Sequence, residues 1–312
     1  MSRIVVGVAG GIAAYKAVDL VRRLSEATHQ VTVVPTVAAL RFVGEPTWAA
    51  ISGRPVVTDL WSSADLVSHV RLGQESDLVL IAPATADLLA RASHGIASDQ
   101  LTNVLLTVQC PVLFAPAMHT EMWQHPATQA NVETLRSRGS IVIEPGYGRL
   151  TGKDSGPGRL PEPAALAELA EELLRVGPGR ARIDMAGMNV VVSAGGTREP
   201  WDAVRFLGNR SSGRQGFALA RNAIARGARV TLVLGITDEN PPAGCAVVRV
   251  ETAEEMRNAM HATVSVEEPD AIIMAAAVAD FRPARTVANK ITKESLDKQP
   301  DDSSVPELAL ER

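Results

Sequence analysis

The sequence of 312 residues contains two cysteines, no long apolar run and no large excess of charge of either sign. Cys110 and Cys245 each lie in or beside an apolar run, which argues against a disulfide framework. A net charge of −4 and a pI near 5.9 carry no signature of nucleic-acid or membrane binding. No apolar run reaches the roughly 18 residues that a membrane span requires. The composition predicts a cytoplasmic globular protein, long enough for two domains.

Four apolar segments in the first half have the spacing of strands in a doubly wound α/β sheet. The first could pass for a short signal peptide, but Gly10-Gly11 and Lys16 interrupt it and favour a strand. A helical pattern follows it to about Ala27. The four expected strands cover residues 4–9, 30–35, 78–82 and 111–115.

Small and polar residues follow each of these strands, and the carboxyl ends of parallel strands meet at one edge of a sheet. We therefore expect a crevice there. The Gly10-Gly11 turn opens a helix, and Thr36 offers a hydroxyl, so both favour a phosphate group. Glycines can also occur in such a turn only because its backbone conformation requires them, without any ligand.

Two histidines are candidates for chemistry. His119 lies in the loop 116–123, after Pro116, where the strand should end because proline cannot donate to a sheet ladder. Taken alone, this Ala/Pro-rich loop with Met and Trp is better explained by packing than by function. His69 precedes a helical segment, and a lone histidine is more often structural or exposed than catalytic.

Four motifs occur in order: Gly-Gly-Ile-Ala-Ala-Tyr-Lys at residues 10–16, Ser-His-Val at 68–70, Ala-Pro-Ala-Thr-Ala-Asp at 82–87 and Pro-Ala-Met-x-x-x-Met-Trp at 116–123. In this combination residues 1–175 resemble the homo-oligomeric flavin-containing cysteine decarboxylases. Residues 150–159 resemble the substrate flap of that family. The resemblance implies His69 as the catalytic histidine, and it implies FMN bound by Gly10, Gly11, Ile12, Thr36, Ala84, Thr85 and Met118.

The sequence departs from this family at two positions. His119 stands where the family has the asparagine that holds the substrate carboxylate; it can still donate a hydrogen bond, and it titrates. Gly152 stands where the flap has its proton-donating cysteine. The donor is therefore left open among Lys153, Asp154, His119 and water. Gly152, Lys153, Asp154 and Arg159 make up the predicted substrate flap.

A second domain is expected from residue 184, which makes residues 1–183 the first domain and 184–312 the second. A helical pattern at 164–176 and a Gly/Pro-rich linker at 177–182 precede it. Strands are expected at 189–193, 229–234 and 271–276, and a helix from about Phe217. The glycines and hydroxyls between the first strand and the helix form an anion cradle. An NAD-binding domain is the alternative, but no G-x-G-x-x-G follows the strand. We predict two Rossmann-like, three-layer α/β domains with mostly parallel sheets.

The second half carries Gly-Gly-Thr-Arg-Glu at 195–199, Asn-Arg-Ser-Ser-Gly at 209–213 and Met-Ala-Ala-Ala-Val-Ala-Asp at 274–280. With Lys-Ile-Thr-Lys at 290–293, these stretches resemble phosphopantothenate–cysteine ligase, the usual fusion partner of the decarboxylase. The resemblance implies CTP-dependent activation of 4′-phosphopantothenate, an intermediate stabilised by Asn209, and Mg²⁺ bridging the CTP phosphates through unassigned protein ligands. The implied CTP-binding residues are Gly195, Gly196, Ser211, Ser212, Gly213, Met274, Ala275, Ala276, Asp280 and Lys290.

Residues 296–312 are polar, with no further strand pattern, so we expect an incomplete ligase domain with nothing folded behind it. Together the two resemblances predict a bifunctional enzyme of coenzyme A biosynthesis. They also imply homo-oligomers, with trimer-based decarboxylase domains and dimerising ligase domains, as in these families. Two alternatives stay open: a flavoprotein that decarboxylates peptidyl cysteine, and a flavin-binding regulatory protein without turnover.

Overall fold

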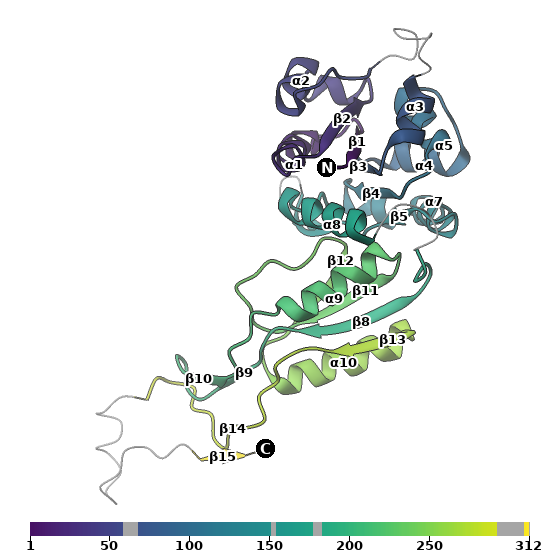
Figure 1. Ribbon diagram of the computed structural model, residues 1–312. Helices are drawn as coiled ribbons and strands as arrows, with labels where there is room; N and C mark the ends of the chain where they lie inside the picture. The colour runs from purple at the N-terminus through teal and green to yellow at the C-terminus, as the bar shows by residue number, and fades with distance from the viewer. Residues whose placement is uncertain (59–67, 151–153, 177–182, 292–308, 312) are drawn as a thin grey trace, which may run out of the picture. The chain divides into compact units, whose positions relative to one another are not determined.

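The computed structural model describes residues 1–58, 68–150, 154–176, 183–291 and 309–311 (Figure 1). The chain divides into two compact units. The first comprises residues 1–188 with 221–229 and 242–245, and the second comprises 189–220, 230–241 and 246–312. The predicted linker at 177–182 lies outside the described residues.

The first unit is built on a five-stranded sheet with the order β2-β1-β3-β4-β5, in which every pairing is parallel. This order reverses direction between β1 and β3, as in the flavodoxin-like type of doubly wound fold. The strands are β1 (Arg3–Val8), β2 (Gln30–Pro35), β3 (Leu78–Ala84), β4 (Val112–Pro116) and β5 (Ile141–Val142).

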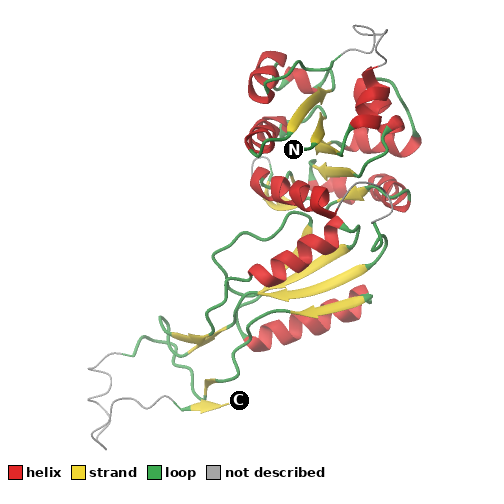
Figure 2. Ribbon diagram, viewed as in Figure 1, coloured by secondary structure: helices red, strands yellow, loops and turns green. Residues whose placement is uncertain are grey.

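Helices cover both faces of this sheet, which makes three layers (Figures 1 and 2). On one face lie α1 (Ala14–Glu26), α2 (Glu45–Ser52) and α8 (Pro163–Val176). On the other lie α3 (Ser68–Glu75), α4 (Ala86–His94), α5 (Gln100–Thr107) and α7 (Pro126–Ser137). The central strands β3 and β4 are continuous apolar runs, as expected for strands that are covered on both faces. Loops carry η1 (Ala39–Arg41), α6 (Thr120–Gln124) and the hairpin of β6 (Gly146–Arg149) with β7 (Ser155–Arg159).

The second unit contains a four-stranded sheet with the order β12-β11-β8-β13, and its central strand β8 pairs with β13 in parallel. Its main elements are β8 (Asn189–Ala194), α9 (Arg214–Ala225), β11 (Arg229–Leu234), β12 (Cys245–Arg249), α10 (Ala253–Glu267) and β13 (Ala271–Met274). Met256 and Met260 of α10 pack on Val191 and Val233. Gly216 of α9 lies against Ala194, which points to the opposite face of the sheet from Val191. Two small pairs, β9 (Arg198–Pro200) with β10 (Phe206–Gly208) and β14 (Arg282–Pro283) with β15 (Leu310–Glu311), complete it.

The doubly wound α/β class is confirmed, and several predicted boundaries are wrong by a few residues. β3 and β4 continue through Pro83 and Pro116 because a proline near a strand end still offers its carbonyl, and Ala84 pairs with Pro116. Helix α9 begins at Arg214 rather than near Phe217. Within residues 296–312, where no strand was expected, Leu310 and Glu311 form the short strand β15, which pairs with β14.

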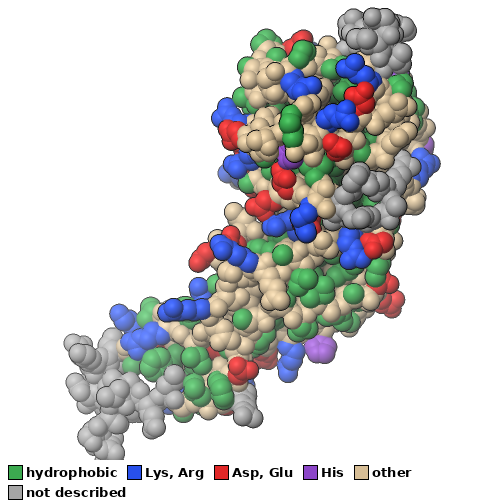
Figure 3. All heavy atoms as spheres, in the orientation of Figure 1, with side chains coloured by type: hydrophobic (Ala, Val, Ile, Leu, Met, Phe, Trp, Pro, Cys, Tyr) green, Lys and Arg blue, Asp and Glu red, His purple; other side chains and the backbone are tan. Residues whose placement is uncertain are grey.

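The surface of the described residues is mixed in charge. Figure 3 shows basic and acidic side chains interspersed over the visible face, as expected for a net charge of only −4. Among the described helices, none has the length and apolar character needed to cross a membrane.

Candidate functional site

The crevice predicted from the sequence falls between the carboxyl ends of the neighbouring strands β1 and β3. The helices that follow these strands, α1 and α4, cover opposite faces of the sheet, and doubly wound sheets bind their ligands at such a reversal. The N–H of Ala9 donates to the carbonyl oxygen of Pro83 at 3.1 Å and holds the two strand ends together. A Cβ on Gly11 would lie 3.5 Å from Cγ2 of Thr85. The structure therefore brings Gly11 and Thr85 together across the crevice.

The β1–α1 turn has the geometry of an anion cradle. A Cβ on Gly10 would overlap the side chain of Ala38, so the turns after β1 and β2 approach as closely as glycine allows. Among the described residues, no acceptor is found for the backbone N–H groups of Gly10 and Ile12. The Ile12 and Val37 side chains beside this turn are 72% and 75% exposed. Free N–H groups flanked by exposed apolar surface fit a phosphate with an attached ring system.

The two threonines assigned to the edge each accept one hydrogen bond from the backbone three residues later. Oγ1 of buried Thr36 accepts the N–H of Ala39 at 3.2 Å, and Oγ1 of Thr85, the N-cap of α4, accepts the N–H of Leu88 at 3.3 Å. A hydroxyl that accepts one hydrogen bond still has its own hydrogen to donate. Both hydroxyl groups can therefore also donate to a phosphate oxygen.

The loop after β4 joins the edge to the flap hairpin. The N–H of Ala117 donates to the carbonyl oxygen of Ala84 at 3.0 Å, which ties this loop to the end of β3. The N–H of Met118 donates to the carbonyl oxygen of Gly158 at 2.9 Å, and the Thr120 hydroxyl donates to that of Pro157 at 2.9 Å. His119, which precedes α6, is exposed.

Two glycines allow the flap strand to lie on this loop. A Cβ on Gly156 would overlap the Thr120 hydroxyl, and one on Gly158, whose φ is +153°, would overlap the carbonyl oxygen of Met118. Of the predicted flap residues, Gly152 and Lys153 lie outside the described residues, and Asp154 is exposed. Arg159 lies 3.4 Å from Oε1 of Glu162, which also accepts Nζ of Lys16 at 2.9 Å.

His69 lies in the first turn of α3, not before a helix. Because α3 leads into the amino end of β3, its first turn points toward the carboxyl edge of the sheet. Helix α5 holds this turn: Gln100 Nε2 donates to the Ser68 hydroxyl at 3.0 Å, and the Thr107 hydroxyl donates to the carbonyl oxygen of His69 at 3.0 Å. Nδ1 of His69 and Oε1 of Gln100 are buried without a hydrogen-bond partner. No hydrogen bond among the described residues joins His69 to the edge loops.

In the second unit, three strand-end loops converge on Gly195 and Gly196. The N–H of Gly196 donates to Ile236 after β11 at 3.0 Å, and Gly195 accepts the N–H of Ala277 after β13 at 2.8 Å. Gly195 has a φ of +82° and lies against Gly213, whose N–H donates to Oγ of Ser211 at 3.3 Å. The Ser212 hydroxyl accepts the N–H of Arg214 at 3.5 Å at the start of α9.

The other predicted ligase residues are distributed around these loops. Asn209 is exposed, and its Nδ2 donates to the carbonyl oxygen of Val278 at 2.9 Å. Met274 is 66% exposed at the end of the edge strand β13. Sequence reasoning missed Ser193, whose buried hydroxyl accepts the N–H groups of Ala275 and Ala276 at 3.2 and 3.3 Å. Its place as a polar residue inside an apolar strand was the available signal.

Asp280 and Lys290 are both exposed. Exposed Asp280 lines a hollow of about 330 Å³ with Glu199, Arg257 and Phe281. Lys290 is exposed beside Ile291, whose N–H donates to Asp202 at 3.1 Å. Burial by itself would raise the pKa of Asp202, but the N–H groups of Val204, Ile291 and Arg205 and the Arg205 charge hold that pKa below its ordinary value. Within the described ranges no cluster of His, Cys, Asp or Glu could hold a metal ion.

Comparisons with known proteins agree with the two-unit architecture. Residues 1–175 match the Flavoprotein family, and residues 185–304 match the DNA/pantothenate metabolism flavoprotein C-terminal domain. The first unit is thus that of a flavoprotein with a flavodoxin-like strand order. The chain is 60% identical to the coenzyme A biosynthesis bifunctional protein CoaBC of Mycolicibacterium smegmatis over 93% of its own length and 70% of that protein. It therefore belongs to the CoaBC family of bifunctional enzymes.

More distant relatives give the same result. The CoaBC protein of Escherichia coli is 42% identical over 94% of this chain and 71% of its own length. The solved structure of a PPC decarboxylase mutant complexed with pantothenoylaminoethenethiol matches 56% of this chain and 98% of its own, with 28% identity and a TM-score of 0.53. The chain spans about 70% of the length of its curated relatives.

Proposed function

We propose that the first domain, residues 1–183, decarboxylates 4′-phosphopantothenoylcysteine with FMN, and that the second, residues 184–312, contributes to the CTP-dependent ligation that makes this substrate. The observation that carries the proposal is the convergence of the loops after β1, β2, β3 and β4 at one crevice of the first unit. Membership of the CoaBC family supports the substrate assignment.

FMN is assigned to the carboxyl edge. The N–H groups of Gly10 and Ile12, the Gly11 turn and the hydroxyl groups of Thr36 and Thr85 are assigned to the phosphate, which the lack of an acceptor for those two N–H groups among the described residues supports. Ala84, which is buried at the end of β3, and half-buried Met118 complete the assigned set. When bound, FMN would supply reversible two-electron chemistry: the substrate's C–S unit is oxidised so that CO₂ can leave with the C–C bonding electrons delocalised toward sulfur, and the same two electrons then return, with a proton, to give the saturated thiol.

The protein's own groups handle the proton and the substrate carboxylate. His69 is assigned proton transfer, because its imidazole has an unpartnered Nδ1 and its helix is fixed by α5. His119 is assigned to hold the carboxylate, in the place of the family's asparagine. The β6–β7 hairpin, anchored on Met118 and Thr120, shields the reacting group from water. The final proton donor stays open among Lys153, Asp154, His119 and water.

CTP and Mg²⁺ are assigned to the second unit. Gly195, Gly196, Ser211 and Gly213 offer close backbone approach and hydroxyl groups at the carboxyl ends of its strands. Asn209 is assigned to stabilise the acyl-cytidylate. Ser212, Asp280, Lys290 and residues 274–276 complete the proposed set, with Mg²⁺ held through the CTP phosphates.

The assembly and location are part of the proposal. Large apolar side chains at the carboxyl edge, among them Ile12 and Val37, are exposed in a single chain. Exposed apolar surface of this kind favours a homo-oligomer in which another copy covers it. The cytoplasmic location predicted from composition stays a prediction.

The test measures flavin binding and CO₂ release on the same protein. Wild type incubated with FMN and freed of excess cofactor should be yellow and release CO₂ from 4′-phosphopantothenoylcysteine, and His69→Asn should stay yellow without release. His125→Asn is the matched control, because His125 caps α7 through Nδ1 and asparagine preserves that cap. A colourless wild type, or a His69→Asn variant with normal release, would contradict the assignment. Flavin binding without any single-turnover CO₂ release would favour a regulatory role.

A further inference from the structure

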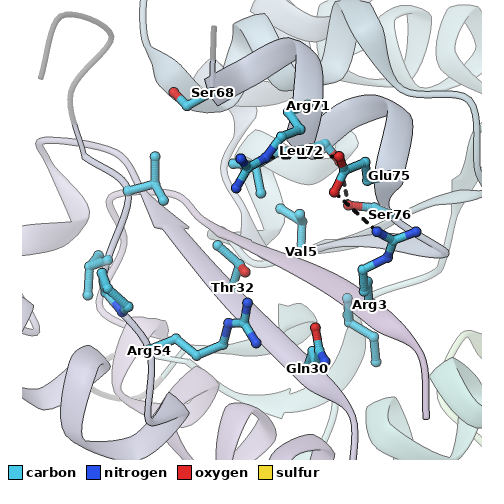
Figure 4. A pocket seen from close by; sticks show the side chains of 14 residues that line it. Arg3, Val5, Gln30, Thr32, Arg54, Ser68, Arg71, Leu72, Glu75 and Ser76 are labelled. Carbon is cyan, nitrogen blue, oxygen red and sulfur yellow. Dashed lines mark hydrogen bonds and ion pairs between the residues drawn. The ribbon is translucent and has the colours of Figure 1, made fainter. Parts of the chain in front are cut away.

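A pocket of about 320 Å³ lies over the amino-terminal halves of β1 and β2, away from the glycine turns (Figure 4). Its floor is one face of the sheet. Arg3 pairs with Gln30 and Val5 pairs with Thr32, and alternate residues of a strand point to the same face. These four side chains therefore line the pocket from below.

Two walls rise from this floor. One wall is α3, which contributes Arg71, Leu72 and Glu75. The other is the chain after α2, residues 54–57, which the N–H of Val57 fastens to the carbonyl oxygen of Val33 in β2 at 3.2 Å. The walls come from separate parts of the chain, and both are anchored to the same pair of strands.

Three guanidinium groups face this pocket, against one carboxylate. Arg3 lies 3.1 Å from Glu75, and Arg71 lies 4.0 Å from the same carboxylate. Arg54 points into the pocket beside Thr32 (Figure 4), and within the described part of the chain its guanidinium has no ion pair. Asp77 accepts the backbone N–H of Arg3 at 2.7 Å but does not line the pocket. The lining thus has an excess of two positive charges.

We propose that this pocket binds a small phosphate monoester or a similar divalent oxyanion with a short apolar part. The described residues of the lining carry three guanidinium groups and one carboxylate, and a divalent oxyanion would balance the two excess positive charges and accept the paired N–H groups of the guanidinium groups. Thr32 and Gln30 add neutral hydrogen-bonding groups. Val5, Val57 and Leu72 offer apolar surface for the rest of the ligand. The pocket lies at the opposite end of β1 from Gly10, so the proposal does not rest on the flavin function.

The test titrates the full chain with n-butyl phosphate, inorganic phosphate and 1-butanol by isothermal calorimetry at constant ionic strength, with and without saturating FMN. We expect n-butyl phosphate to bind more tightly than inorganic phosphate, and 1-butanol not to bind. Arg54→Gln and Arg71→Gln should each weaken binding about tenfold or more, the usual effect of losing a charged hydrogen bond. Arg22→Gln, which removes an exposed arginine on α1, should leave the affinity unchanged.

Three outcomes would overturn the proposal. The first is no heat from wild type with millimolar n-butyl phosphate. The second is an equal loss of affinity in Arg22→Gln, which would indicate general charge attraction. The third is competition by FMN, which would place the anion at the carboxyl edge instead. Because Arg54 makes no ion pair in the described part of the chain, Arg54→Gln should unfold at the same temperature as wild type without ligand, which separates lost binding from lost folding.

Discussion

The backbone N–H of Met118 donates to the carbonyl oxygen of Gly158 at 2.9 Å, which joins the loop after β4 to the flap hairpin. The two residues are forty positions apart, and both belong to motifs that sequence reasoning treated separately. The loop that carries His119 and the flap hairpin are thus joined directly by hydrogen bonds on both sides of His119.

Gly158→Ala should separate the flap from this loop. The new Cβ would overlap the Met118 carbonyl oxygen, and φ is +153° at this position, so we expect the free energy of unfolding to fall by about 2 kcal/mol or more. CO₂ release should fall more than FMN binding, because the flap does not contribute to the cradle. Gly139→Ala is the control: its φ is +83° with open space around it, and a loss of only about 1 kcal/mol without loss of CO₂ release is expected.

Gly10→Ala and Gly11→Ala should differ in their effect on the free energy of unfolding. A Cβ at Gly10 overlaps Ala38, so this change should lower the free energy of unfolding by about 1–3 kcal/mol. A Cβ at Gly11 meets only Thr85 Cγ2 at 3.5 Å, so stability should stay within about 0.5 kcal/mol of wild type. If the crevice holds FMN, Gly11→Ala should nevertheless retain less flavin after gel filtration. Equal flavin content in wild type and Gly11→Ala would count against the cradle.

The Arg91–Asp99 pair should make stability depend on pH. Burial by itself would raise the pKa of Asp99, but hydrogen bonds from Arg91 and Thr102 hold that pKa below its ordinary value. A carboxyl with a depressed folded-state pKa stabilises the fold fully above its unfolded pKa of about 4, and this contribution is lost as pH falls through the folded value.

In urea unfolding at pH 7, the free energy of unfolding should therefore be larger for wild type than for Asp99→Asn. This difference should disappear in acid. Asparagine still caps a helix, so the comparison isolates the charge. The exposed pair Arg23–Asp19 supplies the control, and Asp19→Asn should change stability by less than about 1 kcal/mol at any pH. A difference in free energy of unfolding between wild type and Asp99→Asn that stays constant in acid would contradict this account.

His119 provides a prediction about substrate affinity. If it holds the carboxylate by donating a hydrogen bond, His119→Asn should keep most of the affinity for 4′-phosphopantothenoylcysteine, because an asparagine amide also donates, whereas His119→Ala should bind it about tenfold more weakly. The measurement is the dissociation constant of the substrate for wild type and both variants. Equal affinity in wild type and His119→Ala would refute the assignment.

The sequence predicted the parts of the fold that depend on local patterns. The strand at residues 30–35 and the position of Thr36 after it followed from a short β-rich run and its end, and both were correct. The predicted ends of β3 and β4 were too early, because each was placed before a proline, Pro83 or Pro116. Proline lacks the N–H that donates in a sheet, but its carbonyl group remains available for pairing.

Features that depend on distant contacts were beyond such reasoning. The sequence around Gly156 does not indicate that a side chain there would clash with Thr120. Nor does the sequence around His69 indicate that α5 fixes its turn through Gln100 and Thr107. The arginine pocket was missed for the same reason: Arg3, Arg54 and Arg71 come from three segments without a shared motif, at the end of the sheet where ligands are not expected.

The strand order β2-β1-β3-β4-β5 has a consequence for cooperativity. The loops assigned to the flavin lie between residues 10 and 118, and they meet only when four strands are paired in register. No single βα unit offers the whole set of contacts, so a partly unfolded chain should bind the ligand weakly and be stabilised little by it. Flavin binding is therefore linked to global rather than local unfolding, and the protection it gives should appear in the most slowly exchanging amides of β1 and β3.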